Sequence, residues 1–249
     1  MAQQERAVRT RNALIEAAAE LFSRNGFEVV TLSAISTRAG VSNGALHFHF
    51  ASKAALAAAV WEAAAQRLRQ ITAAAGAPAG SEGGGEGGSK EGNESGSAET
   101  GGALQVLVDA AHALLRGLRH DVILRAGFDL SGAPEPVAAG QPDLRRRWQI
   151  WVEGVLAQAA REGALARDVS AQDAANAVVA ATVGFGAMGS RNVQWLSQSV
   201  LTRFWALLLP RLAADKQLKG LVAAGRRREE RAGAGRMPPP SRVTARSGA

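Results

Sequence analysis

The stretch TLSAISTRAGVSNGALHFHF, residues 31–50, carries the strongest signal for the fold of this chain. Thr31 and Ser42 are residue types that cap helix N-termini, and each precedes a short amphipathic segment. Gly40 lies between the two segments, where a tight turn needs a residue of wide conformational freedom. The pattern predicts two short helices, over 32–39 and 43–49. Two such helices joined by a glycine turn form a helix-turn-helix, whose second helix is slim enough to enter a major groove.

The sequence on both sides of this unit favours helices as well. Gly26 ends one periodic apolar stretch, and Ser52 caps the next. The helix over 43–49 is too short to be stable alone, so we expect Leu46 and Phe50 to anchor it in the core. Helices are predicted over 9–25, 53–75, 103–119, 121–130, 143–163, 171–190 and 197–224, the last of them broken or kinked at Pro210. Because no alternation of period two persists, the predicted fold class is all-α.

Composition limits the kinds of chemistry available. The 249 residues include no cysteine, which excludes disulfides, thiolate zinc sites and a cysteine nucleophile. The first residues are polar and contain no apolar signal-peptide core. The most apolar stretch, 174–189, is interrupted by Asn176 and Thr182 and is too short to span a membrane, so we interpret it as a buried helix. We expect a cytoplasmic protein with no membrane partner.

The net charge of +7 is unevenly distributed along the chain. Residues 226–249 contain seven Lys/Arg and two Asp/Glu, whereas 76–102 contain one and five. Basic ends suit a polyanion, and nucleic acid is the usual one. The expected organisation is a DNA-binding domain over 1–52, a connecting helix over 53–75, a flexible Gly/Ser/Glu linker over 76–102, a ligand-binding and dimerisation domain over 103–225, and a disordered basic tail over 226–249.

Specific short motifs in residues 8–60 carry a family resemblance. They are RTR at 9–11, AAAELF at 17–22, GF at 26–27, TLSAI at 31–35, AGVS at 39–42 and GALHFHF at 44–50, followed by Ser52-Lys53. Together they closely resemble the TetR family of one-component regulators. Residues 6–11 and 44–50 are most similar to the γ-butyrolactone autoregulator receptors of actinobacteria. Those receptors often have a basic residue at the position of Asn43 and an aromatic one at the position of His47.

The resemblance implies a homodimeric repressor on a double-stranded operator with an inverted repeat. The DNA-binding residues it implies are Arg9, Arg11, Thr31, Ser33, Ser42, Asn43, Gly44, His47, Phe48 and Lys53. Asn43 would read base edges, and His47 and Lys53 would contact phosphates. Phe48 would either meet a thymine methyl group or pack. The pair His47 and His49 is not expected to bind a metal, because residues two apart on a helix point to different sides.

The second half of the chain is expected to hold a small-molecule effector and to form the dimer. The candidate ligand-binding residues are large and mostly aromatic: Phe128, Trp148, Trp151, Phe185, Met188 and Trp195. Trp148 best matches a ligand-contacting tryptophan of the resembling receptors. Side chains of this kind at helical spacing also fit an ordinary core, and both interpretations stay open. The helices over 171–190 and 197–224, with Trp205, are expected to form the dimer interface.

Several functional hypotheses remain open. The effector could be a γ-butyrolactone, or an antibiotic, xenobiotic or antibiotic end product, and a constitutive architectural DNA-binding protein is a further alternative, marked by affinity that falls steeply with salt. An enzyme is disfavoured, since no nucleophile elbow, metal-ligand set or phosphate loop is found, and no cofactor is expected. His112 and His120 are interpreted as surface polar residues.

Overall fold

The computed structural model describes residues 1–76, 102–131 and 143–226, and these form helices almost throughout. The fold class is all-α, as predicted; the described residues add one isolated β-bridge between Leu165 and Ala213. The helices are α1 (Ala2–Asn25), α2 (Leu32–Ala39), α3 (Asn43–His49), α4 (Lys53–Ala75), α5 (Gly102–His120), α6 (Val122–Leu130), α7 (Leu144–Arg161), α8 (Ala171–Gly189), η1 (Val193–Leu196), α9 (Gln198–Leu212) and α10 (Asp215–Leu218). The predicted linker and basic tail fall largely on 77–101 and 227–249, outside the described residues.

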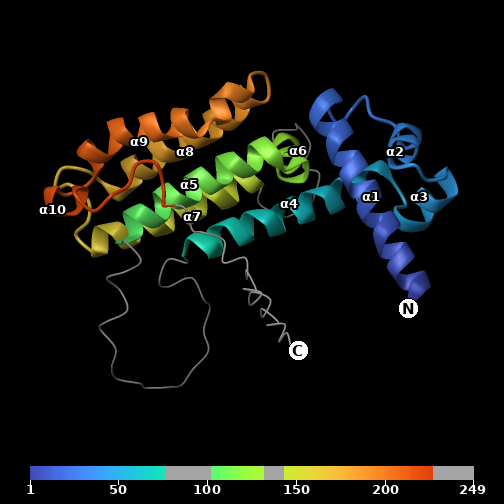
Figure 1. Ribbon diagram of the computed structural model, residues 1–249, viewed down its shortest axis with the longest axis horizontal. Helices are drawn as coiled ribbons and strands as arrows, with labels where there is room; N and C mark the ends of the chain where they lie inside the picture. The colour runs from blue at the N-terminus through green and yellow to red at the C-terminus, as the bar shows by residue number, and fades with distance from the viewer. Residues whose placement is uncertain (77–101, 132–142, 227–249) are drawn as a thin grey trace, which may run out of the picture.

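The helix-turn-helix lies at one end of an elongated molecule (Figure 1). α4 leads away from it and lies on one side of the helical body, with α5 and α7 in the middle and α8 and α9 on the opposite side. One hydrophobic core runs through all of these elements, from Leu14 in α1 to Ala213 after α9. The helix-turn-helix end is therefore packed into the body and is not tethered to it by a loose hinge.

Helix α6 makes the closest junction in this core. It packs against both α4 and α1. Gly127 is buried in α6, and a Cβ there would overlap the Cβ of Ala64 in α4 and lie 2.8 Å from Leu144 Cδ1. A hydrogen bond of 2.6 Å from Ser23 Oγ of α1 to Asp129 Oδ2 of α6 adds a polar link. Movement of α6 must therefore be felt by α1 and α4 together.

Two predicted helices have different limits in the structure. α1 begins at Ala2, seven residues before the predicted start, because the Gln, Glu, Arg and Ala residues of 2–8 are good helix formers. The helix predicted over 197–224 passes through Pro210 but ends at Leu212. There the chain becomes extended, and Ala166 N donates to Leu212 O while Ala214 N donates to Ala164 O. These tertiary backbone bonds replace a continuation of the helix.

The helix predicted to be buried over 174–189 is only half buried. Several residues of α8, including Ala177, Ala180, Ala187 and Met188, are exposed on the single chain. α9 likewise exposes Leu207, which is 82% accessible. An apolar helix face open to water is more costly than a polar one, so these residues indicate a surface that another molecule covers.

Candidate functional site

Three residues with separate tasks shape the helix-turn-helix. Thr31 Oγ1 accepts a hydrogen bond from Ala34 N at 3.2 Å, which caps α2. Ser42 Oγ accepts one from Ala45 N at 3.1 Å, which caps α3. Gly40 adopts φ 68°, a left-handed conformation that side-chain-bearing residues rarely take. The local sequence thus fixes both helix starts and the angle between them.

α3 has one side in the core and the other in solvent. Leu46 is completely buried and Phe50 is 5% accessible, and both belong to the common hydrophobic core with Ile35 of α2. Asn43, Gly44, His47 and Phe48 are exposed. A seven-residue helix would not persist alone, so these anchors hold the exposed side of α3 in position.

Phe48 is the most informative residue on this exposed side. Its side chain is 82% accessible, and its ring meets only the edge of His49 among the described rings, at 5.2 Å between centroids. Of the two sequence interpretations, packing in the core is therefore excluded by its position. A phenylalanine held out in water beside polar residues is typical of a binding surface.

Asn43 is held by a partner that the sequence analysis missed. Ser36 Oγ, from α2, donates to Asn43 Oδ1 at 2.6 Å. Ser36 is 3% accessible, one of the few buried polar residues. The bond uses one lone pair of the carboxamide oxygen and leaves its second lone pair and the NH₂ group available. The sequence contained a signal for this contact, because Ser36 places a hydroxyl next to Ile35 on the apolar side of α2.

The remaining candidates surround α3. Thr31, Ser33 and Ser42 are exposed at or near the starts of α2 and α3. Arg9 and Arg11 are exposed on α1, and the Arg11 guanidinium lies 5.3 Å from the centre of the Phe50 ring. The arrangement brings hydroxyls, guanidinium groups and an amide to one end of the molecule.

Lys53 makes contacts within the chain at the start of α4. Its ammonium donates to Phe27 O at 2.9 Å and to Glu28 O at 3.0 Å, and it lies 4.4 Å from the centre of the Phe27 ring. These contacts fasten the start of α4 to the loop between α1 and α2. They use two of the three N–H donors of the ammonium, and contact of Lys53 with a phosphate stays a prediction.

The aromatic candidates of the second half form two groups. Trp148 is completely buried, donates from Nε1 to Thr182 Oγ1 at 2.9 Å and stacks on Trp151 with 5.1 Å between centroids. Phe185 stacks on Trp195 at 6.3 Å and meets Phe204 edge-on at 5.6 Å. Trp148 therefore packs as core, while its indole N–H is satisfied by a buried hydroxyl.

The other candidates differ widely in exposure. Phe128 is 7% accessible and belongs to the core, whereas Met188 is 48% and Trp195 38% accessible. Trp205, expected at a dimer interface, is completely buried within one chain, and its Nε1 has no acceptor among the described residues. The expectation for Trp205 was wrong because its indole faces the chain's own core.

Among the cavities in the described part of the chain, one of about 220 Å³ lies between α5 and the η1–α9 corner, and another of about 470 Å³ lies between α1 and α6 beside Ser190. None of the six predicted ligand-binding residues lines either of these cavities. Their contact with an effector stays a prediction.

Comparison with known proteins gives a consistent result. Residues 14–60 match the model of the bacterial regulatory proteins of the tetR family. Over 230 residues the chain is 27% identical to the A-factor receptor protein of Streptomyces griseus, covering 91% of this chain and 72% of that one. A crystal structure of a γ-butyrolactone receptor (ArpA-like protein) superposes with a TM-score of 0.67 at 28% identity, covering 88% and 96% of the two chains. CprB from Streptomyces coelicolor, solved with its biological operator sequence, gives 0.66 at 28% identity, covering 86% and 93%.

Over residues 14–60 this chain is thus similar to the tetR family of bacterial regulatory proteins, and over most of its length it is similar to solved γ-butyrolactone receptors. Its exposed helix α3 lies within the range that the family model matches. No helix among the described residues is long and apolar enough to cross a membrane. No group of three or more potential metal ligands occurs within the same residues.

The chain also has a polar contact between its last described segment and α5. The side chain of Gln105, completely buried, accepts from Val222 N at 2.8 Å, and His112 Nε2 bonds to Ala223 O at 2.9 Å. Asp109 Oδ1 accepts from Arg226 N at 2.7 Å. His112 was expected on the surface and is 5% accessible instead. We call residues 219–226 the C-terminal strap.

Acidification is expected to weaken the hold of this strap. Burial lowers the pKa of His112 from its ordinary value of 6.5, and Arg116 lowers it further, while the Ala223 hydrogen bond and Asp109 act in the opposite direction. Because the folded pKa lies below the unfolded one, this contribution to stability is present above pH 6.5 and is lost as pH falls through the folded pKa. Denaturant titrations at pH 7.5 and 5.5 should show a loss of stability that His112→Gln reduces and His47→Gln, at an exposed site, does not. An unchanged pH dependence in His112→Gln would contradict this.

Proposed function

We propose that this chain is a transcriptional repressor that binds an inverted-repeat operator as a homodimer and is released by a small apolar effector such as a γ-butyrolactone. The observation that carries the proposal is the exposed side of α3, where Asn43, His47 and Phe48 point into solvent on a buried anchor. The similarity of the chain to the A-factor receptor protein and to a γ-butyrolactone receptor supports this class of effector.

The proposed contacts to DNA follow from side-chain chemistry. Asn43 keeps an acceptor lone pair and two N–H donors, which is what a bidentate contact to adenine requires. Phe48 offers an apolar edge to a thymine methyl group, and His47 lies one residue before it, where it reaches a phosphate. Arg9 and Arg11 on α1 reach the DNA backbone or the adjacent minor groove. Thr31, Ser33 and Ser42 add hydroxyls for phosphates.

The dimer is proposed to form through α8 and α9. These two helices lie on the side of the body opposite to α4 (Figure 1), and their exposed apolar residues include Met188 and Leu207. A twofold axis through this surface would place two copies of α3 in successive major grooves, which is why the operator is expected to be an inverted repeat.

Release of DNA is proposed to pass through α6. Its packing on both α1 and α4, with Gly127 against Ala64, connects the residues after 103 to the DNA-binding domain. An effector that separates α7 from α8 around Trp148 and Thr182 would bias this junction. It can shift the equilibrium only by its difference in affinity for the two states.

A gel-shift titration on the chain's own promoter region tests the proposal. The full-length protein is mixed with the promoter DNA and excess unrelated DNA, with and without γ-butyrolactones. A specific band that a lactone dissolves supports the whole proposal. A specific band indifferent to lactones contradicts the effector class and directs the search to antibiotics and xenobiotics, and the lack of a specific band contradicts the repressor itself.

Asn43→Ala is expected to remove sequence discrimination while leaving the fold intact. A bidentate contact to a base is worth about 1–3 kcal/mol, so preference for the operator over unrelated DNA should fall by roughly ten- to a hundredfold. In this variant the Ser36 hydroxyl can donate instead to Ser33 O, which lies 3.0 Å from Ser36 Oγ, so α2 should not be disturbed. Competition gel shifts measure the ratio, with Gln70→Ala on the exposed side of α4 as the matched control. Retained discrimination in Asn43→Ala would show that another residue reads the bases.

A further inference from the structure

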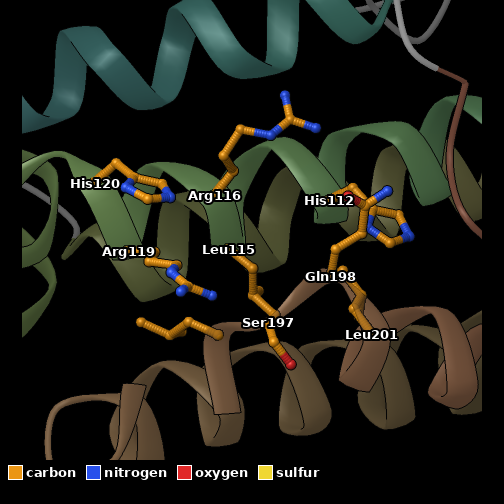
Figure 2. A pocket seen from close by; sticks show the side chains of 9 residues that line it. His112, Leu115, Arg116, Arg119, His120, Ser197, Gln198 and Leu201 are labelled. Atoms are coloured by element: carbon orange, nitrogen blue, oxygen red, sulfur yellow. The ribbon is translucent and has the colours of Figure 1, made fainter. Parts of the chain in front are cut away.

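The cavity between α5 and the η1–α9 corner is lined by both apolar and basic side chains (Figure 2). Its walls combine an apolar base with a basic and polar rim: Leu115, Leu196 and Leu201 with His112, Arg116, Arg119, His120, Ser197 and Gln198. Leu196 and Leu201 are buried and fix the base, and His112 joins it to the C-terminal strap. The cavity is therefore bounded by packed helices and not by mobile surface side chains.

The charge in this cavity is one-sided. Two arginines and two histidines of α5 line it, and no acidic residue does. The carboxylates nearest in sequence are engaged elsewhere, since Asp109 holds Gln105 and Arg226 N, and Asp121 pairs with Arg67. Within the described residues no carboxylate pairs with Arg116 or Arg119. An oxyanion bound in the cavity would compensate the positive charge of these unpaired guanidinium groups.

The two arginines differ in direction. Figure 2 shows Arg119 extending from α5 toward Ser197 across the cavity, while Arg116 points away toward α4. Ser197 caps α9, a helix of fifteen residues whose N-terminal end carries partial positive charge. Arg119 and the start of α9 thus act on the same space, with Gln198 as a further donor at the rim.

We propose that this cavity binds a small organic anion, whose carboxylate or phosphate group is held by Arg119 at the start of α9. Its apolar chain lies against Leu115, Leu196 and Leu201. A volume of about 220 Å³ is below the roughly 300 Å³ at which pockets for drug-sized ligands begin, so the chain must be short. The site is separate from the aromatic residues Trp148 and Trp151, and binding here does not depend on the proposed repressor function.

Calorimetric titration of the full-length protein, without DNA, tests this site. The probes are hexanoate, hexyl phosphate, inorganic phosphate and 1-hexanol. We expect hexanoate or hexyl phosphate to bind once per chain with a Kd below about 1 mM, and the tighter of the two identifies the anionic group. Inorganic phosphate and 1-hexanol should bind more weakly, because each supplies only half of the recognised chemistry.

Variants assign the binding to the cavity. Arg119→Gln should raise the Kd at least about tenfold. His120→Glu, at an exposed rim position, should do so as well by offering a carboxylate to Arg119. Arg167→Gln, which removes an exposed arginine outside the cavity, should leave the Kd unchanged, with circular dichroism as the check on folding. The proposal is overturned if neither amphiphilic anion binds at 10 mM, if 1-hexanol binds as tightly as hexanoate, or if both variants bind as the unmodified protein does.

Discussion

Trp148→Ala is expected to lower the free energy of unfolding by about 3–5 kcal/mol, the range for removing a large aromatic side chain from a core. The indole is completely buried, and its ring is stacked on Trp151. Removing it empties a space between α7 and α8 that neighbouring helices can fill only in part. Chemical denaturation with a helix signal measures the loss.

Two further variants separate the parts of this effect. Thr182→Val leaves the indole N–H without its acceptor, which should cost about 1–3 kcal/mol while the ring stays in place. Trp195→Ala, at a residue that is 38% accessible, should cost clearly less than Trp148→Ala. Equal stability of Trp148→Ala and the unmodified protein would mean that the indole does not support the core.

The same residue decides between core and effector contact. Trp148→Phe keeps most of the apolar volume and should still bind operator DNA. If the indole contacts the effector, this variant will lose its response to the effector in a gel shift, and if it is only core the response will persist. The full burial of Trp148 means that an effector can reach the indole only when α7 and α8 separate.

Gly127→Ala is expected to destabilise the protein by about 2–3 kcal/mol, which is toward the upper end for overpacking. The added methyl group would overlap the Cβ of Ala64, which cannot move unless α4 moves. Because α6 also packs against α1, operator affinity should fall together with stability. Thermal and chemical denaturation measure the first effect, and gel shifts the second.

Gly117→Ala is the matched control for this substitution. Its added Cβ would lie 2.6 Å from Leu124 Cδ2, the end of a flexible side chain that can turn aside. Because both glycines lie in helices, the two substitutions change the backbone entropy of the unfolded chain by a similar amount. If Gly117→Ala costs as much as Gly127→Ala, the close approach of α4 and α6 is not the reason for the loss of stability in Gly127→Ala.

The DNA-binding end was predictable because its signals are local. Thr31, Ser42 and Ser52 each cap a helix that the structure starts at the next residue, as predicted. Phe50 was expected in the core and lies there. Lys53 and Ser36 could not be assigned in this way, since their partners, Phe27 O and Asn43 Oδ1, are brought near only by tertiary packing.

The second half was predictable in class and not in detail. Its helices follow from apolar periodicity, but where α9 stops depends on backbone bonds to the segment near Leu165, fifty residues earlier in the chain. Burial of His112 likewise depends on the strap that crosses α5. Periodicity also cannot distinguish Trp148, which packs as core, from Trp195, which is partly exposed.

The packing of α6 against α1 and α4 also sets how this protein can be recombined with its relatives. A chimera joined at residue 52 would combine α1 with the α4 and α6 of another protein. The apolar side of α1 would then lose the surface against which it packs. A graft that carries residues 122–130 along with residues 1–75 would retain both the contact of Gly127 with Ala64 and the Ser23–Asp129 bond. The transferable unit for changing operator choice is therefore discontinuous in sequence, and engineered sensors made from it should exchange two segments at once.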